Sequence, residues 1–184
     1  DERQALLELS KGKLTTDPEN HTGEGIFFTS RVFDQFEIDS KGVKFSHDDQ
    51  FEFDFILETE FSKDDPGTSV YMLINRDSDR QIQSIFDEYA GPDEFQFNKT
   101  IIPVRLAQYG NEKLVSRSQA KRLLARVERF EHVIFDFEGV QAIGQAFADE
   151  IFRVYAKKHP KIILNPVNMV TDVEKMINRA ISHS

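Results

Sequence analysis

Residues 133–148 have the sequence VIFDFEGVQAIGQAFA, in which a buried strand passes through a turn into a helix. Residues 133–137 are apolar apart from Asp136, a pattern typical of the central strand of a parallel sheet. Residues 146–158 then carry large apolar or aromatic side chains at helical spacing, namely Phe147, Ile151, Val154 and Tyr155. This stretch therefore predicts one strand–helix unit of an α/β fold.

The sequence on either side repeats the alternation of strand and helix. Strands are predicted over residues 100–106 and 162–164, and helices over residues 116–129 and 171–181. The first of these helices begins with a capping box formed by Ser116 and Gln119. Alternation at this spacing predicts right-handed crossovers and a β-α-β-α-β-α domain with a mostly parallel sheet over residues 95–184.

The first half of the chain has a different pattern, which predicts a domain over residues 1–90. Two helices are expected on either side of a polar loop, followed by an antiparallel meander and a further helix. Gly91-Pro92-Asp93 breaks that last helix and marks the predicted domain boundary. The expected helices are 1–9, 26–36 and 79–89, the loop is 11–24, and the strands are 36–38, 43–45, 51–57 and 69–75.

The composition is that of a globular protein and limits the classes of function. Of 184 residues, 39% are hydrophobic and 30% charged, and no apolar run reaches the roughly 18–20 residues that span a bilayer. The net charge of −9 argues against sequence-independent binding to nucleic acid. Without cysteine or a signal peptide, the chain is expected in the cytoplasm, with no membrane contact. Because it starts at Asp1 rather than Met, we expect that the native N-terminus is missing.

Gly23-Glu24-Gly25 lies between the polar loop and an apolar helix. Two glycines let the backbone approach a ligand closely, and the free amides of the helix start face an anion. This arrangement predicts a phosphate-binding loop, with a flexible loop that ends at a helix as the alternative.

The segment GEGIFFTSR, residues 23–31, resembles the glycine box that closes the ATP lid of GHKL ATPases, the superfamily of histidine kinases, anti-sigma kinases, gyrase and MutL. Gly67-Thr68, in a turn before the last predicted strand, resembles the final glycine box of the same fold. The resemblance covers residues 1–77 and implies a partial GHKL α/β sandwich. It also implies nucleotide binding by Gly23, Glu24, Gly25, Gly67 and Thr68 in the complete domain.

Other parts of the GHKL site are missing before Gly23. That family binds Mg-ATP through an upstream helix with Glu and Asn and through an Asp-x-Gly-x-Gly box that recognises adenine, and neither occurs here. The resemblance implies a truncated domain whose full-length form binds ATP and Mg. We expect the present chain to bind ATP weakly or not at all.

Residues 133–148 also resemble the central part of STAS domains, and residues 116–165 resemble a bacterial STAS-like family of unknown function that is often fused to a GHKL ATPase. In the anti-sigma-factor antagonists among STAS domains, a serine in the turn after the strand is phosphorylated. Here the turn is Gly144-Gln145-Ala146-Phe147 and has no hydroxyl group, so that switch is not expected. Gly144, Gln145 and Ala146 are predicted to bind a partner's carboxylate or a small anion, with a plain helix-capping loop as the alternative.

No catalytic or metal-binding residue is predicted. The five histidines form no pair at metal-ligand spacing, and His47 with Asp48-Asp49 is expected in a solvated turn. Glu52 and Asp54 are expected on an exposed strand face, with a pair of catalytic carboxylates as the alternative. The basic residues of helix 116–129 form either a solvated face or a docking face for an acidic partner, such as the chain's own acidic first half, and they are Arg117, Lys121, Arg122, Arg126 and Arg129.

The sequence thus predicts a cytoplasmic bacterial protein of signalling or transcription regulation. Its STAS-like domain would bind a protein partner, coupled to nucleotide binding in the GHKL domain. One alternative is an active ATPase or protein kinase whose catalytic half lies upstream, and another is an interaction scaffold. A sheet edge exposed by truncation would favour a homodimer.

Overall fold

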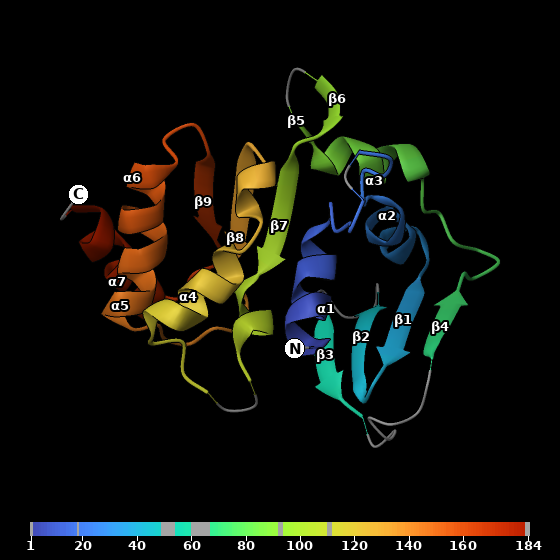
Figure 1. Ribbon diagram of the computed structural model, residues 1–184, viewed down its shortest axis with the longest axis horizontal. Helices are drawn as coiled ribbons and strands as arrows, with labels where there is room; N and C mark the ends of the chain where they lie inside the picture. The colour runs from blue at the N-terminus through green and yellow to red at the C-terminus, as the bar shows by residue number, and fades with distance from the viewer. Residues whose placement is uncertain are drawn as a thin grey trace. The chain divides into compact units, whose positions relative to one another are not determined.

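The computed structural model describes residues 2–17, 19–48, 54–59, 67–91, 94–109 and 112–182. The chain divides into two compact units, Asp1–Phe95 (unit 1) and Gln96–Ser184 (unit 2), which are coloured from blue to green and from green to red in Figure 1. A short two-stranded sheet of β5 (Ala90–Gly91) and β6 (Glu94–Phe97) lies at the division. Pro92 and Asp93 of the predicted boundary lie outside the described residues.

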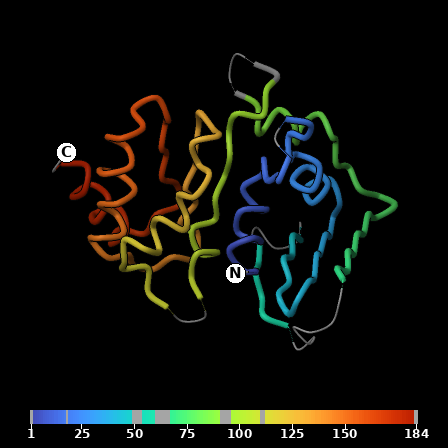
Figure 2. The backbone as a smooth tube through the Cα atoms, in the orientation of Figure 1, coloured from blue at the N-terminus to red at the C-terminus, as the bar shows by residue number. Residues whose placement is uncertain are grey.

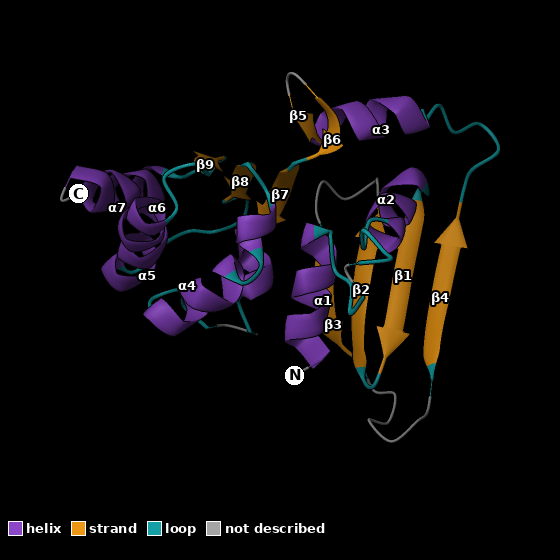
Figure 3. Cartoon of the chain, turned by 45° about the horizontal axis from the view of Figure 1, so that its top comes forward, coloured by secondary structure: helices purple, strands orange, loops and turns teal. Residues whose placement is uncertain are grey.

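The described part of unit 1 combines helices with an antiparallel sheet. Its helices are α1 (Glu2–Lys11), α2 (Gly25–Val32) and α3 (Ile82–Tyr89). Its strands are β1 (Gln35–Ser40), β2 (Val43–Asp48), β3 (Phe55–Glu58) and β4 (Thr68–Leu73). Figure 3 shows α1 and α2 lying over the sheet; α1 contacts β2 and β3, while α2 contacts β1.

The order of the strands differs from the predicted meander. It is β3-β2-β1-β4, so β4 pairs with β1, from Ser40↔Thr68 to Gln35↔Leu73. A fourth strand beside the first is the Greek-key arrangement. The meander was wrong because alternating apolar residues identify a strand but not its neighbour. Phe51 and Phe53 of the predicted third strand lie outside the described residues.

A buried arginine joins the elements of unit 1. The Arg31 guanidinium, on α2, donates from Nε to Tyr89 Oη on α3 (3.1 Å) and from Nη2 to the Ser10 carbonyl on α1 (3.2 Å). It lies 3.8 Å from the centroid of the Phe27 ring and 3.5 Å from Asp54 Oδ2. Arg31 is 6% exposed, so these groups of unit 1 take the place of water around its charge.

A second polar cluster anchors the start of β1 to the loop after β4. Asp34 accepts hydrogen bonds from the Asn75 backbone N–H (2.5 Å) and from Ser78 Oγ (2.9 Å), and Arg80 Nε lies 3.2 Å from its Oδ1. The hydrogen bond from the Asn75 backbone is the main cause that holds the pKa of Asp34 below its ordinary value. Asp34 is therefore ionised in the fold.

Unit 2 has the predicted alternation of strands and helices, which can be followed along the trace in Figure 2. The parallel sheet has the order β7-β8-β9, with β8 in the centre as predicted. Its strands are β7 (Lys99–Pro103), β8 (His132–Asp136) and β9 (Ile163–Val167). Its α-helices are α4 (Arg117–Leu124), α5 (Gln145–Asp149), α6 (Ala156–Lys158) and α7 (Thr171–Ser182).

Irregular helical segments interrupt these elements. A π-helical segment, η3 (Glu150–Tyr155), joins α5 to α6, and 3-10 turns form η1 (Val104–Ala107) and η2 (Val127–Arg129). The predicted helix 116–129 has its capping box, since Gln119 N donates to Ser116 Oγ (3.2 Å) and Ser116 N to Gln119 Oε1 (2.9 Å). It ends five residues earlier than predicted, at Leu124, because the apolar spacing continues through the break into η2.

The core of unit 2 lies between the sheet and its helices. Val133 and Phe135 of β8, followed by Phe137, are fully buried, and Phe152 packs against Phe135 and Phe137 with ring centroids 5.8 and 6.4 Å apart. The alternation of buried and half-buried residues along β8 fixes which face meets the helices. Among the described residues, no helix is long and apolar enough to cross a membrane.

Replacement of Arg31 by alanine should destabilise unit 1 by about 3–5 kcal/mol, because it removes the guanidinium that faces the buried Asp54 carboxylate together with its hydrogen bonds to Tyr89 and Ser10. Urea unfolding followed by circular dichroism measures the change. Arg76→Ala is the matched control, since that side chain is 95% exposed and its loss should cost less than about 0.5 kcal/mol. Equal unfolding midpoints for the two variants would contradict the role assigned to Arg31.

Replacement of Asp34 by asparagine should lower the melting temperature at pH 7. The lowered pKa of Asp34 means that its ionised form stabilises the fold above its ordinary pKa of 3.8, and that this contribution is lost as the pH falls through the lowered value. The difference in melting temperature between wild type and variant should therefore shrink below pH 3.8. A difference that stays constant down to the acid transition would refute this assignment.

Candidate functional site

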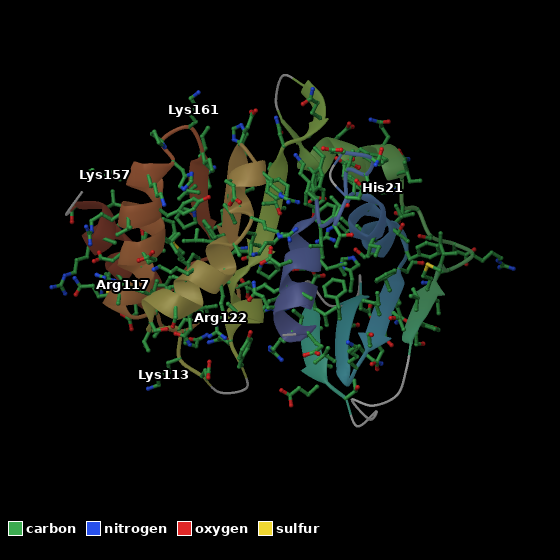
Figure 4. All side chains as sticks on the ribbon, viewed as in Figure 1. His21, Lys113, Arg117, Arg122, Lys157 and Lys161 are labelled. Atoms are coloured by element: carbon green, nitrogen blue, oxygen red, sulfur yellow. The ribbon has the colours of Figure 1, made fainter. Side chains whose placement is uncertain are left out.

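A cavity of about 300 Å³ lies at the N-terminal end of α2 in unit 1. Gly23, Glu24 and Gly25 all line it, together with His21, which is labelled in Figure 4, and Leu14. The start of α2 has no side-chain cap, so backbone N–H groups of its first turn can face a ligand. The structure therefore brings the first three predicted nucleotide-binding residues to one concave surface.

The two glycines of this loop differ in whether the structure leaves room for a side chain. Gly23 has a φ of +74°, and a Cβ there would approach the backbone of Leu14 to 2.6 Å. Gly25 has no atom within 4 Å of an added Cβ. Packing against Leu14 therefore accounts for Gly23 without a ligand, whereas the absence of a side chain at Gly25 leaves open space at the helix start.

Gly67 and Thr68 lie elsewhere in unit 1. Thr68 Oγ1 donates to Ser40 Oγ (3.1 Å), and Ser40 Oγ donates to the Gly67 carbonyl (3.1 Å), so both residues adjoin the end of β1. Neither is among the residues that line the cavity at Gly23–Gly25. The structure does not bring the two predicted glycine boxes together in one cavity.

In unit 2, the loop between β8 and α5 follows the carboxyl end of the central strand. Asp136 Oδ1 accepts hydrogen bonds from the Glu138 backbone N–H (3.0 Å) and from Asn168 Nδ2 in the loop after β9 (2.9 Å). Asp136, the charged residue of the predicted strand, thus joins the loop after β8 to the loop after β9. Ligands of open α/β sheets bind at this edge.

Gly144 fixes the end of this loop. Its backbone N–H donates to the Leu114 carbonyl (2.8 Å), and a Cβ on Gly144 would lie 2.7 Å from Val115 Cα. Gln145 is exposed and Ala146 half-buried at the start of α5, which has no side-chain cap. The three predicted partner-binding residues are adjacent, and the glycine is explained by close backbone packing.

A cavity that sequence reasoning missed lies between α4 and the helix formed by η3 and α6. It has a volume of about 410 Å³, and basic, aromatic and apolar side chains line it. Tyr155 lies in its wall, and burial, with a smaller effect of Glu128, raises the pKa of this tyrosine to about 12. The basic residues of helix 116–129 indicated one wall of this cavity. No sequence pattern indicated the π-helical segment that forms the other wall.

Two expectations about the remaining candidate residues were wrong. His47 lies in β2 rather than in a solvated turn, with Nδ1 2.6 Å from Asp54 Oδ1. Asp54 is buried rather than exposed on a strand face, and Glu52 lies outside the described residues. Within the described part of the chain, no group of three histidine or acidic side chains could hold a metal ion.

Alanine substitution should change the stability by different amounts at the two glycines of the unit 1 loop. Gly23→Ala should lose more than about 1–2 kcal/mol of stability, because a left-handed conformation of alanine costs that much and the Leu14 backbone blocks its Cβ. Gly25→Ala should change stability by less than about 0.5 kcal/mol. Thermal unfolding measures both, and similar losses in the two variants would contradict the loop geometry.

Comparison with known families matches one part of the chain. Residues 119–174 match the model of the STAS-like domain of unknown function (DUF4325), from the first turn of α4 to the first turn of α7. No curated protein and no solved structure matches the chain. The match gives no support to a GHKL portion in unit 1. It agrees with the β-α-β-α-β-α order of unit 2, which therefore contains a STAS-like domain of unknown function.

Proposed function

We propose that the chain is a regulatory protein whose STAS-like unit binds a protein partner through the loop between β8 and α5. The observation that carries this proposal is the loop itself. Asp136 and Gly144 hold its two ends by hydrogen bonds, while Gln141 and Gln145 between and beside them are exposed. A constrained loop with exposed amide groups is suited to recognition because little conformational entropy is lost on binding.

The side chains of the loop favour binding over catalysis. Residues 144–147, the turn that carries the phosphorylated serine in related antagonists, have no hydroxyl group. Gln145 can donate and accept hydrogen bonds but is neither a nucleophile nor a general base. In this proposal, the partner contact is therefore not regulated by a phosphate on this turn.

For unit 1, we propose that the loop at Gly23–Gly25 forms the phosphate-binding part of a GHKL-type nucleotide-binding domain. The cavity formed by Gly23, Glu24 and Gly25 at an uncapped helix start supports it. Mg-ATP would further require the Glu, Asn and Asp-x-Gly-x-Gly groups that these 184 residues lack. In a longer chain with those groups, nucleotide binding would order the loop before α2 and alter partner binding. Turnover of ATP by that longer chain would make the protein an ATPase or kinase.

Calorimetry with Mg-ATP tests the nucleotide proposal. The chain extended upstream by about 150 residues, a typical domain length, should bind, and the 184-residue chain should bind weakly or not at all. Gly25→Leu, which fills the open space at the cavity with an apolar side chain, should weaken binding to the extended chain. Tight binding by the 184-residue chain, or no effect of Gly25→Leu, would show that the cavity is not part of such a site.

Quantitative affinity capture from extracts of the source cells tests the partner-binding loop. Gln145→Trp should lose the proteins that the wild-type chain retains, because a large uncharged side chain replaces the amide and blocks the loop. Asn178→Trp is the matched control, with the same change from an amide to an indole at an exposed position of α7. Identical sets of retained proteins for Gln145→Trp and wild type would exclude this loop as the contact surface.

A further inference from the structure

The cavity of about 410 Å³ in unit 2 is a groove between two helical elements. One wall comes from α4, with Lys121 and Leu124, followed by Ala125. The other comes from η3, α6 and the residue that follows, with Glu150, Val154, Tyr155, Lys158 and His159. The groove therefore lies away from the loop between β8 and α5, since none of Gly144, Gln145 and Ala146 lines it.

The floor of this groove is apolar. Leu124 packs inward with 5% of its surface exposed, whereas Val154 remains 38% exposed. Val154 lies on the helix next to Tyr155, and both are in the lining. An aliphatic side chain left open between two helices can be covered by an aliphatic side chain of a ligand.

Positive side chains stand at both rims. Lys121 on α4 is 69% exposed and Lys158 on α6 is exposed, on opposite walls. Glu150 is the one acidic residue in the lining; its carboxylate is buried and lies 4.0 Å from both Arg117 and Lys121. Two cations flank this single carboxylate, so the surface around the groove carries net positive charge.

Basic residues are numerous throughout unit 2. Figure 4 labels five further basic residues of unit 2, which are Lys113, Arg117, Arg122, Lys157 and Lys161. Unit 2 as a whole has 14 Lys and Arg against 9 Asp and Glu, although unit 1 has 9 against 23. The net charge of −9 therefore conceals a basic STAS-like unit.

The helix that forms the second wall has an unusual geometry at the groove. Glu150–Tyr155 is π-helical, and such segments occur frequently at functional sites. At its last residue, the Tyr155 ring stacks on the His159 ring with centroids 4.2 Å apart. The Tyr155 hydroxyl is buried and makes no hydrogen bond to any group that the structure describes.

We propose that this groove binds an acidic segment of the protein partner, with one apolar side chain against Leu124 and Val154 and carboxylates facing Lys121 and Lys158. The inference rests on the proposed partner-binding function and adds the chemistry of the partner. Charge complementarity favours an acidic segment over a basic one. The apolar floor favours a peptide over a nucleic-acid backbone, which presents phosphates and has no aliphatic side chain to fill it.

Fluorescence anisotropy tests this proposal on the full chain. The probe is a fluorescein-labelled peptide Glu-Glu-Leu-Leu-Glu-Glu, and the matched probe has lysine in place of each glutamate. The acidic peptide should bind and the basic one should not. Lys121→Glu combined with Lys158→Glu should weaken binding by about tenfold or more, since two attractive contacts become repulsive.

Further variants make the result specific to the groove. Lys175→Glu, an exposed lysine on α7, is the matched control for the single reversals Lys121→Glu and Lys158→Glu. It should leave the affinity unchanged, whereas each of those reversals should weaken binding. Val154→Ser should weaken binding without a change of charge. Circular dichroism melting confirms that each variant is folded.

Several outcomes would overturn the proposal. One is that Lys175→Glu weakens peptide binding as much as the double variant does, and another is that Val154→Ser has no effect on it. The proposal is also overturned if the basic peptide binds, or if a short DNA duplex at equal concentration displaces the acidic peptide. Gln145→Trp, which leaves the charge unchanged, separates the two hypotheses. If this variant keeps both peptide binding and partner capture, the loop is refuted and the groove is retained. If it alone loses peptide binding, the groove is refuted.

Discussion

The arrangement of unit 1 depends on the buried charge of Arg31. One guanidinium reaches the carbonyl at the end of α1, the hydroxyl of Tyr89 on α3 and the carboxylate of Asp54 before β3. A buried guanidinium is costly unless each N–H finds an acceptor, so these elements must keep their places around it. The cavity at Gly23–Gly25 lies at the other end of the same short helix, and its position is therefore fixed by this network.

In unit 2, close backbone contact takes the place of buried charge. The Gly144 amide bonds to Leu114, and the neighbouring Val115 leaves no room for a side chain. Together with the hydrogen bonds of Asp136, this contact determines where α5 begins. The two units thus position their candidate sites by different means, one by a satisfied ion network and the other by backbone proximity.

Elements with a strong local signal could be predicted from the sequence. The capping box at Ser116 and the apolar run of β8 led to the correct helix start and the correct central strand. The position of β4 beside β1 could not be predicted, because pairing depends on contacts distant in the chain. The burial of Arg31 was missed since a charged residue on an apolar helix is normally exposed.

The candidate sites were predictable only as short segments. Gly23–Gly25 and Gly144–Ala146 each lie together in the structure, but Gly67-Thr68 lies away from the first cavity, a separation that motif spacing did not reveal. The groove between α4 and α6 was not predicted because the π-helical segment has no sequence signature.

That π-helical segment also sets the rotational register of the residues beyond it. Each residue of an α-helix advances the chain by about 100°. A wider turn between Glu150 and Tyr155 therefore redirects every side chain that follows, including Lys158 and His159. Ordinary α-helical winding of the same residues would rotate both away from their present positions. Removal of a single amino acid from this turn would restore that winding and keep both facing the groove, because a π-helical turn holds about one residue more than an α-helical turn. Relatives that are one residue shorter here could therefore share both the sheet and the wall of the groove.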